Sequence, residues 1–141
     1  MSDMYNLRII AADRAFYEGP CLSLIVPAFD GEKEILAHHE SMVIAVTDGE
    51  MHYKTEDGTW HIGYVGRGFV QIANNRVILL TESAEKPEEI DVRRAEEAKE
   101  RALEQLRQKQ SIQEYYHSSA SLARAMARLK TSRQTAGKIR I

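Results

Sequence analysis

Three arginines and two acidic residues in the second half of the chain have types and spacings that suit anion binding. Arg124 and Arg128 lie four positions apart, so on a helix they share one face. Two like charges at this spacing cost an isolated helix roughly a few tenths of a kcal/mol, and an anionic partner would offset that cost. Guanidinium groups suit phosphate or carboxylate because their planar donors match paired oxygens. A solvated basic face remains the alternative interpretation.

Asp91 and Arg94 lie three positions apart where an earlier helix is expected to begin. They suit either a local ion pair at the helix start or a nucleotide site, with Arg94 on phosphate and Asp91 on ribose. Glu85, just before the helix, could complete such a site. In an antiparallel hairpin the start of the first helix lies near the end of the second. Arg94 then converges with Arg124 and Arg128, which favours the anion-site hypothesis.

Metal binding and catalysis are not expected. Adjacent His38 and His39 point apart on most backbones, and no second cluster has the spacing of metal ligands. The chain offers no Ser-His-Asp order, no Cys-His pair and no Walker loop, so we expect a non-catalytic protein that requires no cofactor. Cys21 is the only cysteine, which excludes an internal disulfide, and its apolar surroundings indicate a small buried hydrophobe.

The elements that must position these residues fall into two parts. Through residue 87, apolar residues tend to alternate and turn pairs such as Asp30-Gly31 and Asn74-Asn75 separate short segments. Eight short strands at roughly ten-residue spacing predict an antiparallel β-sandwich over residues 1–87. The expected strands are 5–11, 21–27, 34–36, 43–46, 50–54, 60–65, 69–73 and 77–81.

Beyond Pro87, strong helix formers dominate, and apolar residues recur at three- and four-residue spacing. We predict an antiparallel two-helix hairpin over residues 88–130, with an acidic first turn and a second helix capped by Ser111. Many positions of its expected seam are Ala, which buries little area, so the hairpin should be marginal and able to open. The seam of the second helix is expected at Ile112, Tyr115/Tyr116, Ala120, Leu122/Ala123, Met126 and Leu129. Residues 131–141 are expected to form a basic flexible tail.

The charge divides along the same boundary. Residues 1–89 carry 7 Lys/Arg against 15 Asp/Glu, whereas residues 90–141 carry 12 against 6. The acidic part is a poor candidate for nucleic acid, and the basic part could meet an acidic protein surface, a nucleotide or RNA. The apolar runs are far shorter than the roughly 20 residues of a membrane span, and the N-terminus does not resemble a secretory signal.

Several motifs resemble the ε subunits of bacterial F-type ATP synthases. Residues 5–19 are similar to the family's opening strand and turn, and residues 26–32 to its next loop. The most specific match is Ile90-Asp91-Val92-Arg93-Arg94-Ala95, an I-D-x-x-R-A motif, followed by an R-A-x-x-R-L motif over residues 124–129. The sequence departs from the family at Ala37-His38, where Pro-Gly is usual.

This resemblance implies a rotor subunit of the central stalk, at the cytoplasmic face of the bacterial membrane. The sandwich would dock on the γ subunit and the c-ring. The hairpin would either fold on the sandwich or extend along γ into the catalytic α/β head, where it blocks ATP hydrolysis. In some members the folded hairpin binds regulatory ATP. The residues implied for nucleotide are Glu85, Ile90, Asp91, Arg94, Ala95, Arg124 and Arg128, and those for γ and c-ring contact are Asp30, Gly31, Glu32, His38 and His39.

A second hypothesis is a β-domain adaptor whose basic helical arm binds protein or RNA. It predicts RNA binding that weakens steeply with salt. The acidic sandwich and the row of Glu96, Glu97, Glu100 and Glu104 on the first helix oppose it. A hydrolase would need a nucleophile and base that the sequence does not offer.

Overall fold

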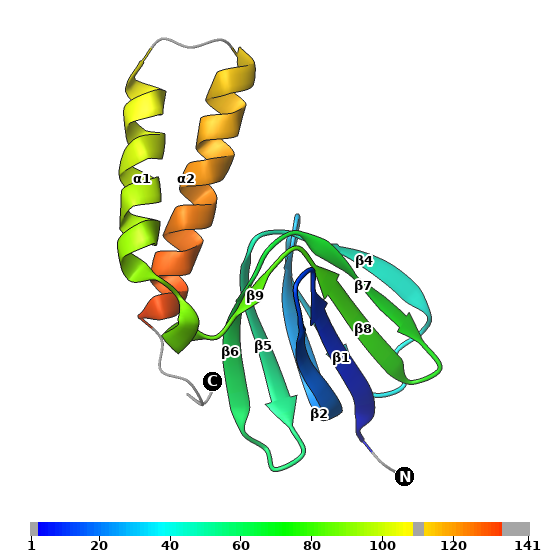
Figure 1. Ribbon diagram of the computed structural model, residues 1–141. Coiled ribbons are helices and arrows are strands. Elements are labelled where there is room, and N and C mark those ends of the chain that lie inside the picture. The colour runs from blue at the N-terminus through cyan, green and yellow to red at the C-terminus, as the bar shows by residue number, and fades with distance from the viewer. Residues whose placement is uncertain (1–2, 109–111, 134–141) are drawn as a thin grey trace.

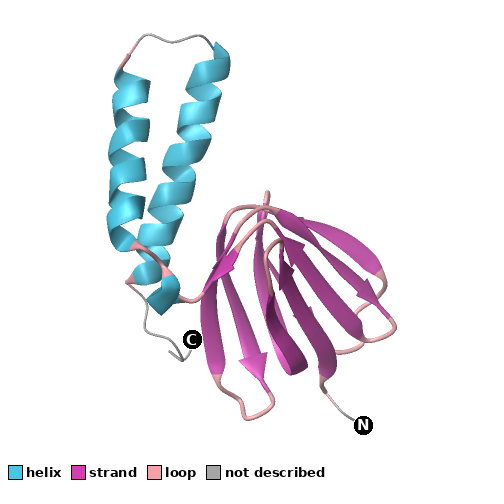
Figure 2. Cartoon of the chain, viewed as in Figure 1, coloured by secondary structure: helices cyan, strands magenta, loops and turns pink. Residues whose placement is uncertain are grey.

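The computed structural model describes residues 3–108 and 112–133, which form a β-sandwich followed by two helices (Figure 1). Its strands are β1 (Tyr5–Ala11), β2 (Ala15–Ala28), β3 (Gly31–Leu36), β4 (Met42–Val46), β5 (Gly49–Thr55), β6 (Trp60–Val65), β7 (Gly68–Ala73), β8 (Arg76–Thr81) and β9 (Ala84–Glu85). A 3₁₀ turn, η1 (Pro87–Glu89), leads to α1 (Val92–Arg107) and α2 (Ile112–Ser132). Strands and helices are separated along the chain and in space (Figure 2), which confirms the predicted fold class.

One hydrogen-bonded sheet folds over on itself to make the sandwich. The strand order is β4-β7-β8-β1-β2-β5-β6-β9, and β3 pairs with β2 beside this path. The long strand β2 connects the two halves, because its first part pairs with β1 and its last part with β3 and β5. All pairs are antiparallel except β1 with β8, which run parallel. In this strand order the first strand of the chain, β1, lies near the middle of the sheet, between β8 and β2.

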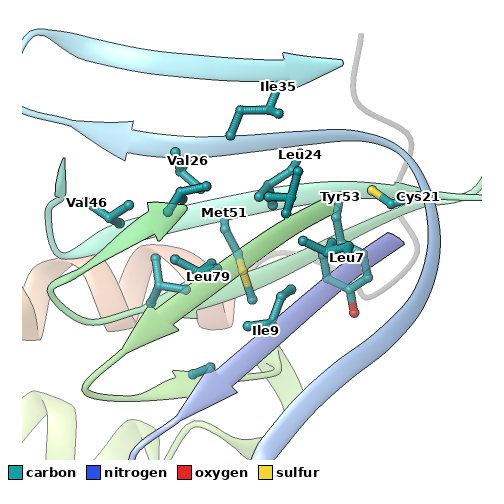
Figure 3. Packing of buried hydrophobic residues seen from close by; sticks show 14 of the residues in the cluster. Leu7, Ile9, Cys21, Leu24, Val26, Ile35, Val46, Met51, Tyr53 and Leu79 are labelled. Carbon is teal, nitrogen blue, oxygen red and sulfur yellow. The ribbon is translucent and has the colours of Figure 1, made fainter. Parts of the chain in front are cut away.

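The core consists of alternate residues on the inward face of the strands. In β1, for example, Leu7 and Ile9 are fully buried while Asn6 and Arg8 are exposed. These side chains pack with Leu24, Met51 and Leu79 from other strands (Figure 3). Every residue of this cluster belongs to a strand, so the core of the sandwich is built without the helices.

The predicted strands agree with the structure except at places where the alternation is weak. β2 begins at Ala15, six residues earlier than expected, because Gly19 and Pro20 interrupt the apolar pattern in its first half. β3 begins at Gly31, three residues earlier than expected, and the two-residue strand β9 was not predicted. The Asn74-Asn75 turn between β7 and β8 is confirmed, and both residues have positive φ.

The hairpin differs from its prediction in several details. Glu88 and Glu89 lie in the 3₁₀ turn rather than in the first turn of α1. α2 continues to Ser132, so the first two residues of the expected tail are helical; residues 134–141 and the expected cap Ser111 lie outside the described residues. The predicted seam of α2 was partly wrong. Tyr115, Tyr116, Ala120, Ala123 and Met126 are exposed, whereas the predicted Leu129 and the unpredicted Ser118 and Ala125 are buried. The side chain of Ile112 lies outside the described part of the structure.

Candidate anion-binding site

A pocket of about 350 Å³ lies where the start of α1 meets the C-terminal half of α2 beside β9. Its volume falls within the usual range for small-molecule sites, roughly 300–1,000 Å³. The lining residues are Glu85, Asp91, Arg94, Ala95, Ala98, Arg101, Ser121, Arg124, Ala125 and Arg128. Four of them are arginines from two antiparallel helices and two are carboxylates, so the lining has a net positive charge.

Helical periodicity explains how these arginines meet. Arg94 and Arg101 are seven positions apart, or two turns of α1, so they lie on one face. Arg124 and Arg128 lie one turn apart on the facing surface of α2. The small side chains of Ala95 and Ala125, both buried, let the two helices approach closely between them. The small residues of the seam therefore bring the two pairs of guanidinium groups together.

Arg128 connects the pocket to the sandwich. Its Nε donates to Oε1 of Glu85 in β9 at 3.0 Å, and this ion pair is about two-thirds buried. Its guanidinium carbon also lies 4.4 Å from the ring centroid of Tyr64 in β6, a cation–π contact. Burial raises the pKa of the Tyr64 hydroxyl to about 12, although Arg128 acts in the opposite direction. The end of α2 is thereby held on the outer face of β6 and β9.

Asp91 supports the helix that carries Arg94. Its Oδ1 accepts a hydrogen bond from the backbone N–H of Arg94 at 3.1 Å, which makes Asp91 the N-cap of α1. No ion pair joins the two side chains in the part of the chain that the structure describes, so the first of the two interpretations of this spacing, a local ion pair, does not hold. The cap leaves the guanidinium of Arg94 available to the pocket.

The charges of the pocket are unevenly matched. Among the described residues, Arg128 is the only one of the four arginines with a carboxylate within ion-pair distance. Arg124 donates to the neutral hydroxyl of Ser121 at 3.1 Å. Guanidinium groups gathered in one cavity repel each other unless an anion lies between them, and phosphate oxygens match their donor geometry. The arrangement is suited to a phosphorylated ligand.

Six of the seven residues expected to bind nucleotide line this one pocket. Glu85, Asp91, Arg94, Ala95, Arg124 and Arg128 all contribute to its wall. Ile90 does not line it and is 6% exposed, so its side chain is packed inside the protein. Sequence reasoning missed Arg101, although its seven-residue spacing from Arg94 was the signal that could have found it.

The residues expected to contact γ and the c-ring lie in the β2–β3 turn, at the start of β3 and just after it, rather than in the pocket. Asp30 of the turn pairs with Lys33 of β3 at 3.1 Å, and Gly31, with a φ of +117°, and Glu32 are the first two residues of β3. Lys33 lowers the pKa of the Asp30 carboxyl. Phe29 in the same turn is 87% exposed, so it is a surface residue and an additional candidate for contact.

His38 and His39 follow β3 and do not form a cluster with other metal ligands. The backbone N–H of His38 donates to Oδ1 of Asn75 at 2.7 Å, and Nδ1 of His39 lies 2.8 Å from the carbonyl oxygen of Glu40. Within residues 3–108 and 112–133, no group of three or more His, Cys, Asp or Glu residues is placed to hold a metal ion. In the same ranges no helix is long and apolar enough to cross a bilayer.

Fold and pocket together define a small sandwich-and-hairpin protein in which a charged cavity joins the two parts. Two family models match it in sequence: the ATP synthase delta/epsilon chain β-sandwich domain over residues 4–87, and the long α-helix domain of the same chains over residues 88–133. The ATP synthase epsilon chain of Ruminiclostridium cellulolyticum is 41% identical over 128 residues, covering 91% of this chain and 95% of that protein. That of Caldanaerobacter subterraneus is 38% identical, covering 92% and 94%.

The chain therefore belongs to the delta/epsilon family of ATP synthase chains, as an epsilon chain of the bacterial F-type enzyme. Solved structures show the same fold. A chain in the Euglena gracilis mitochondrial ATP synthase (OSCP/F1/c-ring) has a TM-score of 0.79 at 21% identity, covering 90% of this chain and 80% of that one. A chain in the Tetrahymena thermophila central stalk and c-ring has a TM-score of 0.67 at 9% identity, covering 90% and 95%.

Proposed function

We propose that this chain is a non-catalytic rotor subunit of the ATP synthase central stalk, at the cytoplasmic face of the bacterial membrane. Family membership supports this, and the two similar structures come from assemblies titled as containing the c-ring. The strand-built core would make the sandwich rigid enough to transmit torque between the c-ring and the γ subunit. The turn from Asp30 to Glu32 and the segment with His38 and His39 are the proposed contacts.

The hairpin is the regulatory element, and the arginine pocket is the observation that supports this role. The pocket takes residues from β9, α1 and α2, so a ligand inside it favours the state in which all three are together. A ligand at a hundredfold excess over its Kd stabilises that state by about 2.7 kcal/mol. This is enough to shift a marginal equilibrium. ATP, with a triphosphate for the four arginines, is the proposed ligand.

At low ATP the hairpin would leave the sandwich and extend along γ toward the catalytic α/β head, where it inhibits hydrolysis. The basic character of residues 90–141 suits an acidic surface there. At high ATP the ligand would retain the hairpin on the sandwich and release the enzyme from inhibition. Capture of γ and c subunits with the tagged chain supports the rotor assignment. Capture of nucleic acid instead would support the adaptor hypothesis.

Calorimetric titration of the full chain with ATP, ADP and GTP tests the nucleotide site. Saturable binding with a preference for ATP supports a sensor. Absence of binding up to millimolar ATP contradicts it, and the four arginines would then serve structure and inhibition.

Arg124→Ala is the first variant to titrate. We expect it to abolish ATP binding without changing the unfolding of the sandwich, because Arg124 lines the pocket and lies outside the core. Arg93→Ala is the matched control, since Arg93 is on α1 but pairs with Glu97 outside the pocket. If Arg124→Ala binds ATP as tightly as the control, the pocket is not the nucleotide site.

A further inference from the structure

The segment between the sandwich and the hairpin is fastened by an arginine from the far end of the sequence. Arg14 lies in the turn between β1 and β2. Its Nη1 donates to Oε2 of Glu89 at 2.7 Å and its Nη2 to Oε1 at 3.0 Å, so the contact is bidentate. The Nη2 group also donates to the carbonyl oxygen of Ala84 at 2.9 Å. One guanidinium thus holds both β9 and the 3₁₀ turn. Bidentate geometry makes this pair more specific than a single surface contact.

The carboxylate of Glu89 also makes a hydrogen bond within the 3₁₀ turn. Its Oε1 accepts a hydrogen bond from the backbone N–H of Lys86 at 2.9 Å, which closes the 3₁₀ turn. Glu89 therefore fixes the shape of the turn and its attachment to the β1–β2 turn at the same time. Ile90 follows directly and is buried, so the connection is held by packing up to that residue.

The backbone changes character immediately beyond this point. Ile90 has φ −72° and ψ 125°, and Asp91 has φ −78° and ψ 94°, so both are extended between two helical segments. From Arg94 onward the chain is held by α1 itself, with Asp91 as its cap. Extended residues at the end of an element are where hinge motions are absorbed.

We propose that the hairpin turns about the Ile90–Asp91 junction, and that the Arg14–Glu89 pair creates this hinge by keeping residues 84–90 part of the sandwich. Arg14 is then a positioning residue: it does not line the pocket, but it sets where α1 begins relative to Glu85. Without the pair, the flexible length grows to include the 3₁₀ turn, and the hairpin samples a wider range of positions. This inference rests on the mobile hairpin of the proposed function.

The test measures hairpin position in the full chain without nucleotide, so it is independent of ATP binding. Spin labels are placed at Gln71→Cys in β7 and Glu100→Cys in α1, both exposed positions. The native Cys21 is buried and does not compete for label. Pulsed electron paramagnetic resonance then gives the distribution of distances between the two spin labels, and so between the sandwich and the hairpin.

Four backgrounds are compared: the parent, Arg14→Ala, Glu89→Gln and the double variant. Glu89→Gln keeps the shape and an acceptor for the Lys86 N–H while it removes the charge, so it protects the test against loss of folding. We expect each single variant to broaden the distribution and the double variant to broaden it no further. Arg8→Ala, which breaks the exposed Arg8–Glu18 pair of the same sheet, should match the parent.

Two results would overturn the proposal. One is an Arg14→Ala distribution as narrow as that of Arg8→Ala. The other is additive broadening in the double variant, because Glu89→Gln keeps the acceptor for Lys86 and so should act only through the contact that Arg14→Ala also removes. The nucleotide site is tested separately by ATP titration of the parent. Failure of the nucleotide site would appear as absent ATP binding, and failure of the hinge as unchanged distance distributions in the variants.

Discussion

Tyr64 presents its ring to Arg128 but leaves its hydroxyl without a hydrogen-bond partner among the described residues. The side chain is fully buried on the face of the sheet where α2 packs. A buried hydroxyl without a partner costs about 1–3 kcal/mol. The ring of Tyr64 therefore stabilises the packing of α2 on the sheet, whereas its unpartnered hydroxyl destabilises the folded protein.

Tyr64→Phe separates these two effects. The ring is kept and the unpartnered hydroxyl is removed, so we expect the free energy of unfolding to rise by about 1 kcal/mol. Tyr64→Leu, which loses the ring, should instead weaken docking of α2. Chemical denaturation of both variants, monitored by circular dichroism, checks the expectation. A Phe variant less stable than the parent would show that the hydroxyl is satisfied in solution.

Glu89 makes the attachment of the 3₁₀ turn to the β1–β2 turn dependent on pH. Its hydrogen bonds from Arg14 lower the pKa of its carboxyl below the ordinary 4.5. Asp13 and Glu85 add negative charge near Arg14, and Lys86 adds positive charge near Glu89. Because the folded pKa is the lower one, the stabilisation is complete above pH 4.5 and is lost as pH falls through the folded value.

Acid titration of the hairpin position therefore distinguishes Glu89 from its neighbours. We expect the distance distribution of the spin-labelled parent to broaden below pH 4.5, while Glu89→Gln is already broad and changes less. Equal acid responses of the parent and the variant would show that Glu89 is not the group responsible.

At the scale of elements, the hairpin seam is built mainly from small side chains. Ala95, Ala102 and Ala125 are buried in it and contribute little apolar area. A polar contact replaces apolar packing farther along, where Oγ of Ser118 donates to Oε1 of Gln105 at 3.0 Å. Tyr115 and Tyr116 contact each other edge to face but remain exposed. The seam depends on close approach more than on buried surface.

Ala102→Leu tests this dependence. Ala102 is 1% exposed, and a larger side chain in a closely packed seam costs typically 1–3 kcal/mol. We expect the variant to open the hairpin while the sandwich keeps its thermal unfolding temperature. Ala123→Leu, on the exposed face of α2, adds the same atoms without effect. Equal behaviour of the two variants would show that the seam has spare volume.

The strands and helices were predictable to the extent that periodicity marks them. Alternation located most strands, and the change of composition at Pro87 located the hairpin. The face of α2 was harder to predict, because alanines occur around much of the helix and Ser118 and Ala125 are too small or polar to indicate a core position. Spacing identified six pocket residues, whereas the Arg14–Glu89 contact joins residues 75 positions apart and leaves no pattern in sequence.

At the scale of the molecule, the sandwich has a hydrophobic core of its own, whereas the hairpin packs against it over a small area. The core cluster is complete without helical residues, whereas the hairpin touches the sandwich through α2 on β5 and β6 and through the 3₁₀ turn. A chain ending after Ile90 keeps the core and the Arg14–Glu89 pair. We expect it to fold and unfold cooperatively, measured by thermal denaturation, and to bind no ATP. A molten or unfolded product would mean that the helices complete the fold.

The parallel pairing of β1 with β8 affects when the sandwich can fold during synthesis. Asn6 is paired with Arg76, so a central strand of the sheet leaves the ribosome long before one of its two neighbours exists. Contacts so distant in sequence slow folding, because the intervening chain must be ordered before they form. The nascent sandwich therefore cannot complete its sheet until β8 has been synthesised, and the hairpin follows β8 in the chain.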